Sequence, residues 1–164
     1  MLVQQLSRVL SEAPTILPCV GINVRHYKDD GDVERWVELI NLAFRNGKPA
    51  MRCWTEPDFR QRIMAHPDWT PWNLFLAHNK HHQLVGSVSL VFRQSPDVPH
   101  PALHLLAVRP DARRLGIARM LVAMLESAAW QRGYREIVLE THAGWKEAAQ
   151  FYAAVGYQLR APTM

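Results

Sequence analysis

The sequence predicts an α/β fold, with helices packed against a sheet, and three observations predict it. Short apolar strands are expected at 103–108 and 137–141, and the segment between them has apolar residues at helical spacing, which is typical of a parallel strand–helix–strand unit. Residues 72–78 and 84–92 have the pattern of two strands joined by a polar loop, which predicts a hairpin. Strand-like and helix-like segments also alternate along the chain without an internal repeat.

The composition fits a single globular domain over 1–164. The residues are 48% hydrophobic and 21% charged, which excludes a disordered chain, and the length is enough to bury a core. The sequence has no apolar run long enough to span a bilayer and no convincing signal peptide, so we expect a cytoplasmic protein without a membrane partner. Cys19 and Cys53 lie far apart, which excludes a disulfide framework and a cysteine zinc site.

The first 94 residues are expected to hold a helix, a strand, two further helices and the hairpin. The N-terminal helix, over 1–14, is predicted from apolar residues at helical spacing, namely Leu2, Leu6, Val9 and Leu10. A strand over 20–27 precedes a helix that begins near Asp30 and ends at Asn46-Gly47. Thr55 then caps a helix that runs to about Ala65. The Pro-rich segment 95–101 is expected to be an exposed connector.

The part over 103–159 has the clearer pattern. The strand over 103–108 leads through a turn at 113–116 into a long amphipathic helix, for which Gly133 is the expected C-terminal cap. A strand over 137–141 follows. A last helix over 146–154 is ended by Gly156, and a final strand begins at Tyr157.

A phosphate-binding turn is predicted where the strand over 103–108 meets the long helix. The first amides of a helix have no partner within it and carry the positive end of its dipole, so they bind anions. Gly116 allows a ligand close to the backbone, and Ala118 is nearly as small. From 103 to 135 there are six arginines against Asp111 and Glu126, a local charge of 6 − 2 = +4. The alternative is that Gly116 only caps a turn and the arginines are solvated.

The full arrangement resembles the acyl-CoA signature of the GNAT superfamily of N-acetyltransferases. The matching residues are Arg113-x-x-Gly116-x-Ala118 at the start of the long helix. A downstream stretch is similar as well, through Ala148, Phe151-Tyr152, Val155 and Gly156-Tyr157. The resemblance implies a mixed, largely antiparallel sheet with helices on both faces and a V-shaped splay between its two central parallel strands.

It also implies that acetyl-CoA is the cosubstrate and that an amine is the acceptor. The pyrophosphate is expected on the amides of the turn and helix start, and the pantetheine arm on the main chain of the central strand. The residues implied are Leu106, Ala107, Val108, Arg113, Arg114, Leu115, Gly116, Ile117, Ala118, Arg119, Trp145, Ala148 and Tyr152. Tyr152 lies where the family often has the general acid that protonates the departing thiolate. The alternative for Tyr152 is packing on the cofactor alone.

His104 is the first candidate for the base that takes the proton of the amine. Strand alternation puts it on one face with Leu106 and Val108, and a neutral imidazole can act as a base at physiological pH. The alternative is that His104 covers a layer of the sheet while water carries the proton. Glu140 and His142 are weaker candidates. His81 and His82 are expected in a solvated turn, and the eight histidines show no metal-ligand spacing, so we expect no metal.

The chain departs from the family pattern in three places. Trp145 stands where the family often has Asn, and Ala102 and His104 stand where its usual Glu is expected. Only seven residues follow Tyr157, too few for the family's last full strand, so the strand is expected from a partner subunit in a homodimer, or the sheet is smaller. Four aromatic residues are expected partly in the core and partly in the acceptor-site wall: Trp54, Phe59, Trp69 and Trp72.

These observations favour a single-domain N-acetyltransferase that moves acetyl from acetyl-CoA to a primary amine by direct attack in a ternary complex. A catalytically silent acyl-CoA-binding module is the alternative, because the usual Glu is missing and Trp145 replaces the Asn that the family often has. Nucleic-acid binding ranks behind both, since the sequence has no basic helix or aromatic strand typical of such modules.

Overall fold

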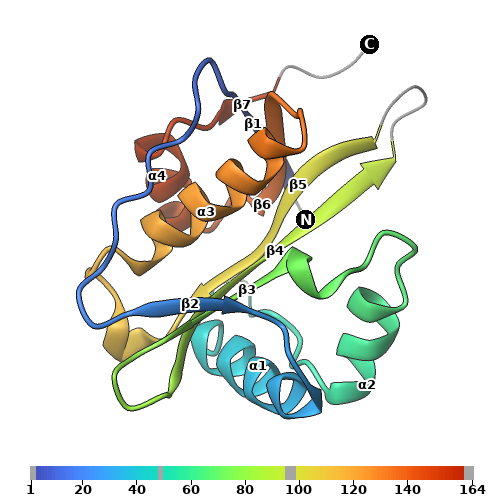
Figure 1. The fold of residues 1–164 in the computed structure, drawn as a ribbon, viewed down its shortest axis with the longest axis vertical. Helices are drawn as coiled ribbons and strands as arrows, with labels where there is room; N and C mark the ends of the chain where they lie inside the picture. The colour runs from blue at the N-terminus through green and yellow to red at the C-terminus, as the bar shows by residue number, and fades with distance from the viewer. Residues whose placement is uncertain (1–2, 48–49, 95–98, 161–164) are drawn as a thin grey trace.

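Seven strands form one sheet in the order β2-β3-β4-β5-β6-β1-β7 in the computed structural model, which describes residues 3–47, 50–94 and 99–160 (Figure 1). The strands are β1 (Val3–Val9), β2 (Asn23–His26), β3 (Leu74–His78), β4 (Leu84–Gln94), β5 (Pro99–Val108), β6 (Glu136–His142) and β7 (Gln158–Leu159). All neighbours are antiparallel except β5 and β6, which are parallel. The predicted mixed, largely antiparallel sheet is therefore confirmed.

Helices cover both faces of the sheet, as predicted (Figure 1). Helix α1 (Asp30–Ala43) and the short α2 (Glu56–Phe59), which continues as a π-helical turn over Arg60–Met64, pack on one face. Helices α3 (Ile117–Gln131) and α4 (Lys146–Ala154) pack on the other. Short 3₁₀ turns lie at Pro71–Asn73 and Pro110–Ala112. Among the described residues, none of the helices combines the length and the apolar character that crossing a membrane requires.

Side-chain caps explain where α1 and α2 begin. The Asp29 side chain accepts a hydrogen bond from the amide of Gly31 at the start of α1. Thr55 and Asp58 form a capping box at the start of α2, as expected for Thr55. Helix α1 ends earlier than predicted, because its last backbone bond joins the amide of Phe44 to the carbonyl of Ile40.

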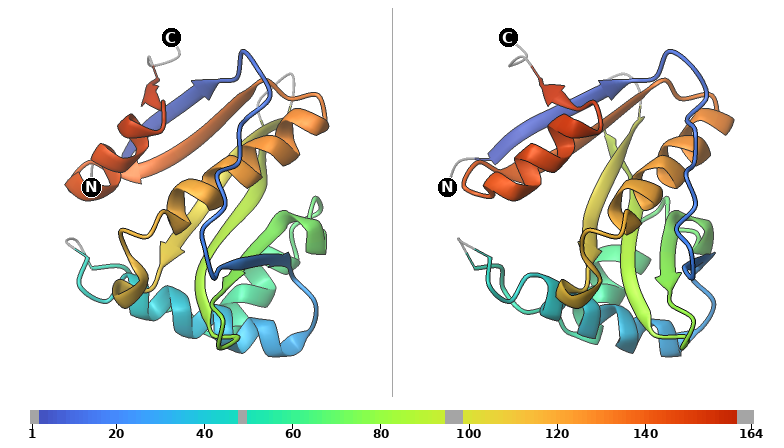
Figure 2. Two further views of the ribbon diagram at one scale, coloured as in Figure 1. Left: turned by 60° about the vertical axis from the view of Figure 1, so that its left-hand side comes forward. Right: turned by 90° about the vertical axis from the view of Figure 1, so that its left-hand side faces the viewer.

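The prediction of an N-terminal helix over 1–14 is wrong, because residues 3–9 form β1, which pairs with β6 (Figure 2). Leu6 lies opposite Leu139 in the core, while Val3 and Val9 are exposed on the other face. The apolar residues fit the period of a strand as well as that of a helix, and pairing with β6 decides between the two. Leu2 lies outside the described residues.

Strand β1 fills the place in the sheet where a strand from a partner subunit was expected. It lies between β6 and β7, so the chain supplies this strand itself. The Arg8 guanidinium binds both carboxylate oxygens of Glu126 on α3, at 2.8 and 2.9 Å, and the Tyr157 hydroxyl donates to the same carboxylate at 3.1 Å. This cluster ties β1 to α3 and to the C-terminal segment. The homodimer stays a prediction, but its stated reason is removed.

The connector and the first predicted strand also differ from expectation. Residues 95–98 of the connector lie outside the described residues, and Pro99 and Pro101 already belong to β5, which pairs with β4 as a hairpin. The strand predicted over 20–27 is shorter, since β2 begins at Asn23 after a turn in which Gly21 has a φ of 76°.

Candidate cofactor cleft and active site

The start of α3 offers backbone amides that nothing in the helix uses. Gly116 is the N-cap residue with a φ of 89°, and its lack of a side chain leaves the helix without a side-chain cap. The first backbone bond of the helix joins the amide of Met120 to the carbonyl of Gly116 at 3.0 Å. The amides of 117–119 are therefore left for a ligand, at the positive end of the helix dipole.

Gly86 on β4 allows this helix start to lie close to the sheet. A Cβ at Gly86 would lie 2.9 Å from Cγ2 of Ile117 and 3.1 Å from Cδ1 of Leu121. It would also lie 3.3 Å from the carbonyl oxygen of Ala107 on β5. Because real Cβ atoms essentially never approach within 3.0 Å, any other residue here would force Ile117 to shift. The start of α3 and the end of β5 are thereby held together.

The end of β5 is not paired with a strand on the side that faces β6. In parallel register β5 and β6 pair only at Ala102 and Val138 among the described residues, and beyond this point the two strands splay. On its other side β5 stays paired with β4, up to Val108 opposite Gly86. Residues 106–108 thus form an open strand edge inside the fold, to which an extended arm with amide groups can add as a further strand.

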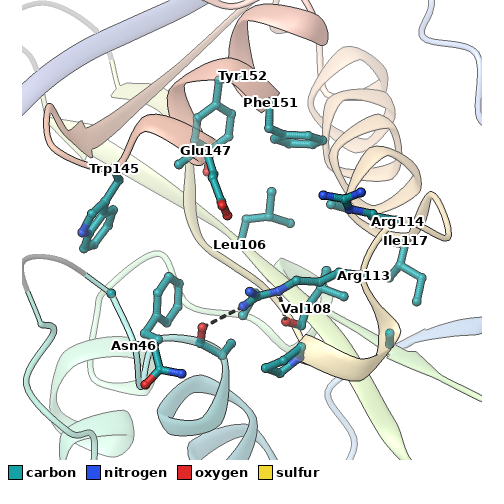
Figure 3. Close-up of a pocket in the computed structure, with 18 of the residues that line it drawn as sticks. Asn46, Leu106, Val108, Arg113, Arg114, Ile117, Trp145, Glu147, Phe151 and Tyr152 are labelled. Atoms are coloured by element: carbon teal, nitrogen blue, oxygen red, sulfur yellow. Dashed lines mark hydrogen bonds between the residues drawn. The ribbon is translucent and has the colours of Figure 1, made fainter.

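A cleft of about 930 Å³ joins this strand edge to the start of α3 (Figure 3). Its walls come from the end of α1, from 106–119 and from the β6–α4 loop with α4. Arg113, Arg114, Arg119 and Lys146 line it, and Glu147 is the one acidic residue among the described lining residues. The cleft is therefore a long, cationic slot suited to an anionic ligand with an extended arm.

The cleft brings together twelve of the thirteen residues predicted to bind the cofactor. The exception is Leu115, whose side chain is 63% exposed and lines a separate depression under residues 12–19. Arg113 is held by the backbone, because its guanidinium donates to the carbonyls of Val108 at 3.3 Å and Ala43 at 2.8 Å (Figure 3). Arg113, Arg114 and Arg119 are all exposed, and Arg113 braces the turn against α1.

Tyr152 points from α4 into the cleft, above Leu106 (Figure 3). Its ring is buried against Phe151 and Tyr157, and burial raises the pKa of the phenol above its usual value. The hydroxyl therefore stays protonated at physiological pH and is available as a hydrogen-bond donor in the cleft.

His104 lies on the opposite face from the one that alternation predicts. In the pairing of β4 with β5, Ser87 lies opposite Ala107 and Ser89 lies opposite His104. Two residues of β5, Leu105 and Leu106, therefore lie opposite the single residue of β4 between the two serines. This bulge, in which Leu105 has a φ of 49°, turns His104 away from the cleft. Its Nδ1 is buried without a hydrogen-bond partner among the described residues. Burial, with Arg93 and Arg62 nearby, lowers the pKa of His104 to about 4.

The two weaker candidates for the base each interact with another group of the protein. Glu140 is exposed and pairs with Arg93 at 3.4 Å. Nδ1 of His142 accepts a hydrogen bond from the amide of Gly144 at 3.0 Å. His81 and His82 are exposed in the β3–β4 turn, as expected. No group of three or more His, Cys, Asp or Glu side chains in the described part of the chain is placed to hold a metal ion.

The aromatic residues predicted partly for the acceptor wall divide in the structure. Trp54 and Phe59 are buried in the core under α1, where they pack edge-on to Trp36, and Trp69 is half-buried beside Phe59. Trp72 is 65% exposed and contacts His26.

Sequence reasoning missed two parts of the cleft. Glu147 lies in the first turn of α4, where an acidic side chain ordinarily stabilises the helix dipole, so the sequence alone gave no functional signal. The end of α1 contributes Leu42, Ala43, Phe44, Asn46 and Gly47. These residues lie about 70 positions before the turn at 113–116, and only the fold brings them to it.

Comparison with known proteins identifies a family. Residues 33–157 match the profile of the acetyltransferase (GNAT) family. The chain is 29% identical over 152 residues to a mycothiol acetyltransferase of Cellulomonas flavigena, covering 88% of this chain and 42% of the relative. It is 26% identical over 139 residues to that of Geodermatophilus obscurus, covering 84% and 44%. The chain thus spans less than half the length of these two relatives.

Solved structures share the fold. A GCN5-related N-acetyltransferase from Sphaerobacter thermophilus superposes with a TM-score of 0.77 at 19% identity, over 96% of this chain and 48% of that one. An aminoglycoside N-acetyltransferase in complex with CoA superposes with a TM-score of 0.67 at 16% identity, over 87% and 91%.

Proposed function

Because the chain belongs to the GNAT acetyltransferase family, we propose that it transfers an acetyl group from acetyl-CoA to a primary amine by direct attack in a ternary complex. The observation that carries the proposal is the uncapped start of α3, which opens into the same cleft as the free strand edge of β5. The first feature fits a pyrophosphate and the second fits the amide-bearing pantetheine arm.

In this proposal the amides of 117–119 bind the pyrophosphate, and Arg114 and Arg119 add positive charge. The main chain of Leu106, Ala107 and Val108 holds the pantetheine arm. The small side chains of Ala118 and Ala148 leave room beside it. The thioester then lies beyond Leu106, at the end of the cleft away from the arginines.

The chemical step forms a C–N bond and breaks the C–S bond of the thioester. The amine lone pair attacks the carbonyl carbon, and main-chain amides of β5 polarise the carbonyl oxygen. The Tyr152 hydroxyl donates to the departing sulfur. Burial raises the pKa of Tyr152, but the same desolvation acts on the thiolate beside it and raises the pKa of the thiol. This keeps Tyr152 suited to stabilising the leaving group.

The proton of the amine goes to water or to His104. A pKa of about 4 keeps the His104 imidazole neutral at physiological pH but makes it a weak base. Its position outside the cleft lining favours a route in which water carries the proton.

The acceptor proposed for the first test is an amine related to mycothiol, because the relatives are named mycothiol acetyltransferases. The net charge of +4 disfavours polycationic acceptors and favours neutral or acidic amines and peptides. We place the reaction in the cytoplasm, since both cysteines are free thiols, which fits a reducing compartment.

Thiol release from acetyl-CoA over a panel of amines, measured beside acetyl-CoA binding by calorimetry, tests the proposal. Amine-dependent thiol release is the expected result. Tight binding without release on any amine would favour a silent acyl-CoA-binding module, and no binding would reject both functions.

A further inference from the structure

Two aromatic rings meet across the cleft, on the side away from the start of α3 (Figure 3). Phe44 is the residue that ends α1, and Trp145 is the residue that begins α4. Their ring centroids lie 5.9 Å apart with planes inclined by 25°, which is a stacked arrangement. Both side chains line the cleft, one from each wall. The pair therefore links the two halves of the fold that the cleft separates.

The position of the pair relative to the ligand follows from the two ends of the cleft. Arg114 and Ile117 mark the phosphate end, and Trp145 lies on the opposite side of the cleft, with Tyr152 and Leu106 between them (Figure 3). A molecule that has its phosphates at the start of α3 and its arm along 106–108 must have its acyl end on the Trp145 side. The stacked rings are thus at the end of the path that the acyl group follows.

The rings are also supported from behind. Phe44 packs against the buried cluster under α1, and so does Leu105 of the β5 bulge. On the other wall, Trp145 contacts the ring of His142, at the end of β6, with centroids 5.9 Å apart. The rings of Phe44, Trp145 and His142 therefore form a row from α1 to β6. An acyl chain longer than acetyl would have to separate the Phe44 and Trp145 rings, and each of them packs against a further group.

We propose that the Phe44–Trp145 pair closes the acyl end of the cleft and restricts the acyl group to acetyl. This inference rests on the proposed function, because it takes an acyl-CoA as the ligand. It assigns a specificity role to Trp145, the position at which the sequence departs from the Asn of the family. An Asn side chain is too short to reach Phe44 and stack on it.

Calorimetric binding of CoA, acetyl-CoA and butyryl-CoA tests the inference without knowledge of the acceptor. We expect the parent protein to bind butyryl-CoA at least tenfold more weakly than acetyl-CoA. Trp145→Ala and Phe44→Ala should reduce this ratio to about one, with the affinity for CoA itself changed less. Trp145→Phe keeps a ring and should keep most of the discrimination. Trp130→Ala, at the far end of α3, is the matched control and should behave as the parent.

The outcomes separate this inference from the proposed function. Equal affinity of the parent for acetyl-CoA and butyryl-CoA would overturn the inference while the cofactor site stands. Discrimination retained in both Trp145→Ala and Phe44→Ala would overturn it as well. Failure of the parent to bind even CoA would reject the proposed function and the inference together.

Discussion

Replacement of Gly86 by alanine perturbs the contact that holds the start of α3 against β5. The added Cβ would lie 2.9 Å from Ile117 and 3.3 Å from the backbone of Ala107, and both residues are buried. The helix start must therefore move away from the sheet. Overpacking of this kind costs about 1–3 kcal/mol. Because the same movement separates the amides of 117–119 from the strand edge at 106–108, we also expect the Kd for CoA to rise tenfold or more.

Urea unfolding and calorimetric titration with CoA measure the two effects in one protein preparation. Gly31→Ala is the matched control. Its Cβ would meet only side-chain ends, of Asp29 at 3.2 Å and Arg35 at 3.3 Å, and it lies in the first turn of α1. This variant should keep the CoA affinity of the parent. A Gly86→Ala protein with unchanged stability and unchanged CoA affinity would refute the argument that close packing at Gly86 builds the site.

Three further predictions concern the acid, the N-terminal strand and the histidine. Tyr152→Phe should lower turnover by about 10²-fold with little change in CoA affinity, and a rate within a few-fold of the parent would leave Tyr152 a packing role. Arg8→Met leaves the Glu126 carboxylate buried without its cationic partner, with the Tyr157 hydroxyl still donating to it, so chemical denaturation should show a loss of about 3 kcal/mol. Arg8→Met with Glu126→Leu should restore this loss in part, because the buried Tyr157 hydroxyl then lacks its acceptor. An equally stable single variant would contradict the role of Arg8. The lowered pKa of His104 means that the unfolded chain binds more protons than the folded one between pH 6.5 and about 4. The free energy of unfolding should therefore decrease by up to about 3 kcal/mol as the pH is lowered through this window. His104→Gln should show a smaller decrease. Identical pH profiles of the two proteins would count against a neutral His104 in the folded state.

Local patterns were enough to predict several of the elements that line the cleft. The apolar spacing in 117–131 and the turn around Gly116 are features of adjacent residues, and the structure has α3 and its positive-φ glycine where they were predicted. The helix over 146–154 has the predicted bounds as well. These segments obey one periodicity over several turns, which is the condition under which sequence reasoning works.

The errors occur where distant residues decide the structure. Residues 3–9 become a strand because β6, more than 120 positions away, pairs with them. His104 changes face because of a bulge that strand alternation cannot reveal. The Phe44–Trp145 stack and the close approach at Gly86 likewise depend on contacts between segments far apart in the chain. Motif spacing could predict which residues of 106–119 line the cleft, but not that Phe44 and Trp145 stack across it.

The central claim is that the uncapped start of α3 binds the pyrophosphate of CoA, and calorimetry on Gly116→Glu tests it most directly. The glutamate would put bulk and negative charge at the amides of 117–119. Gly133→Glu is the control, because Gly133 also has a positive φ, of 92°, with open space around it, but lies beyond the other end of α3. We predict that Gly116→Glu binds CoA at least tenfold more weakly than the parent while Gly133→Glu binds it normally. A folded Gly116→Glu protein with the affinity of the parent would contradict the account.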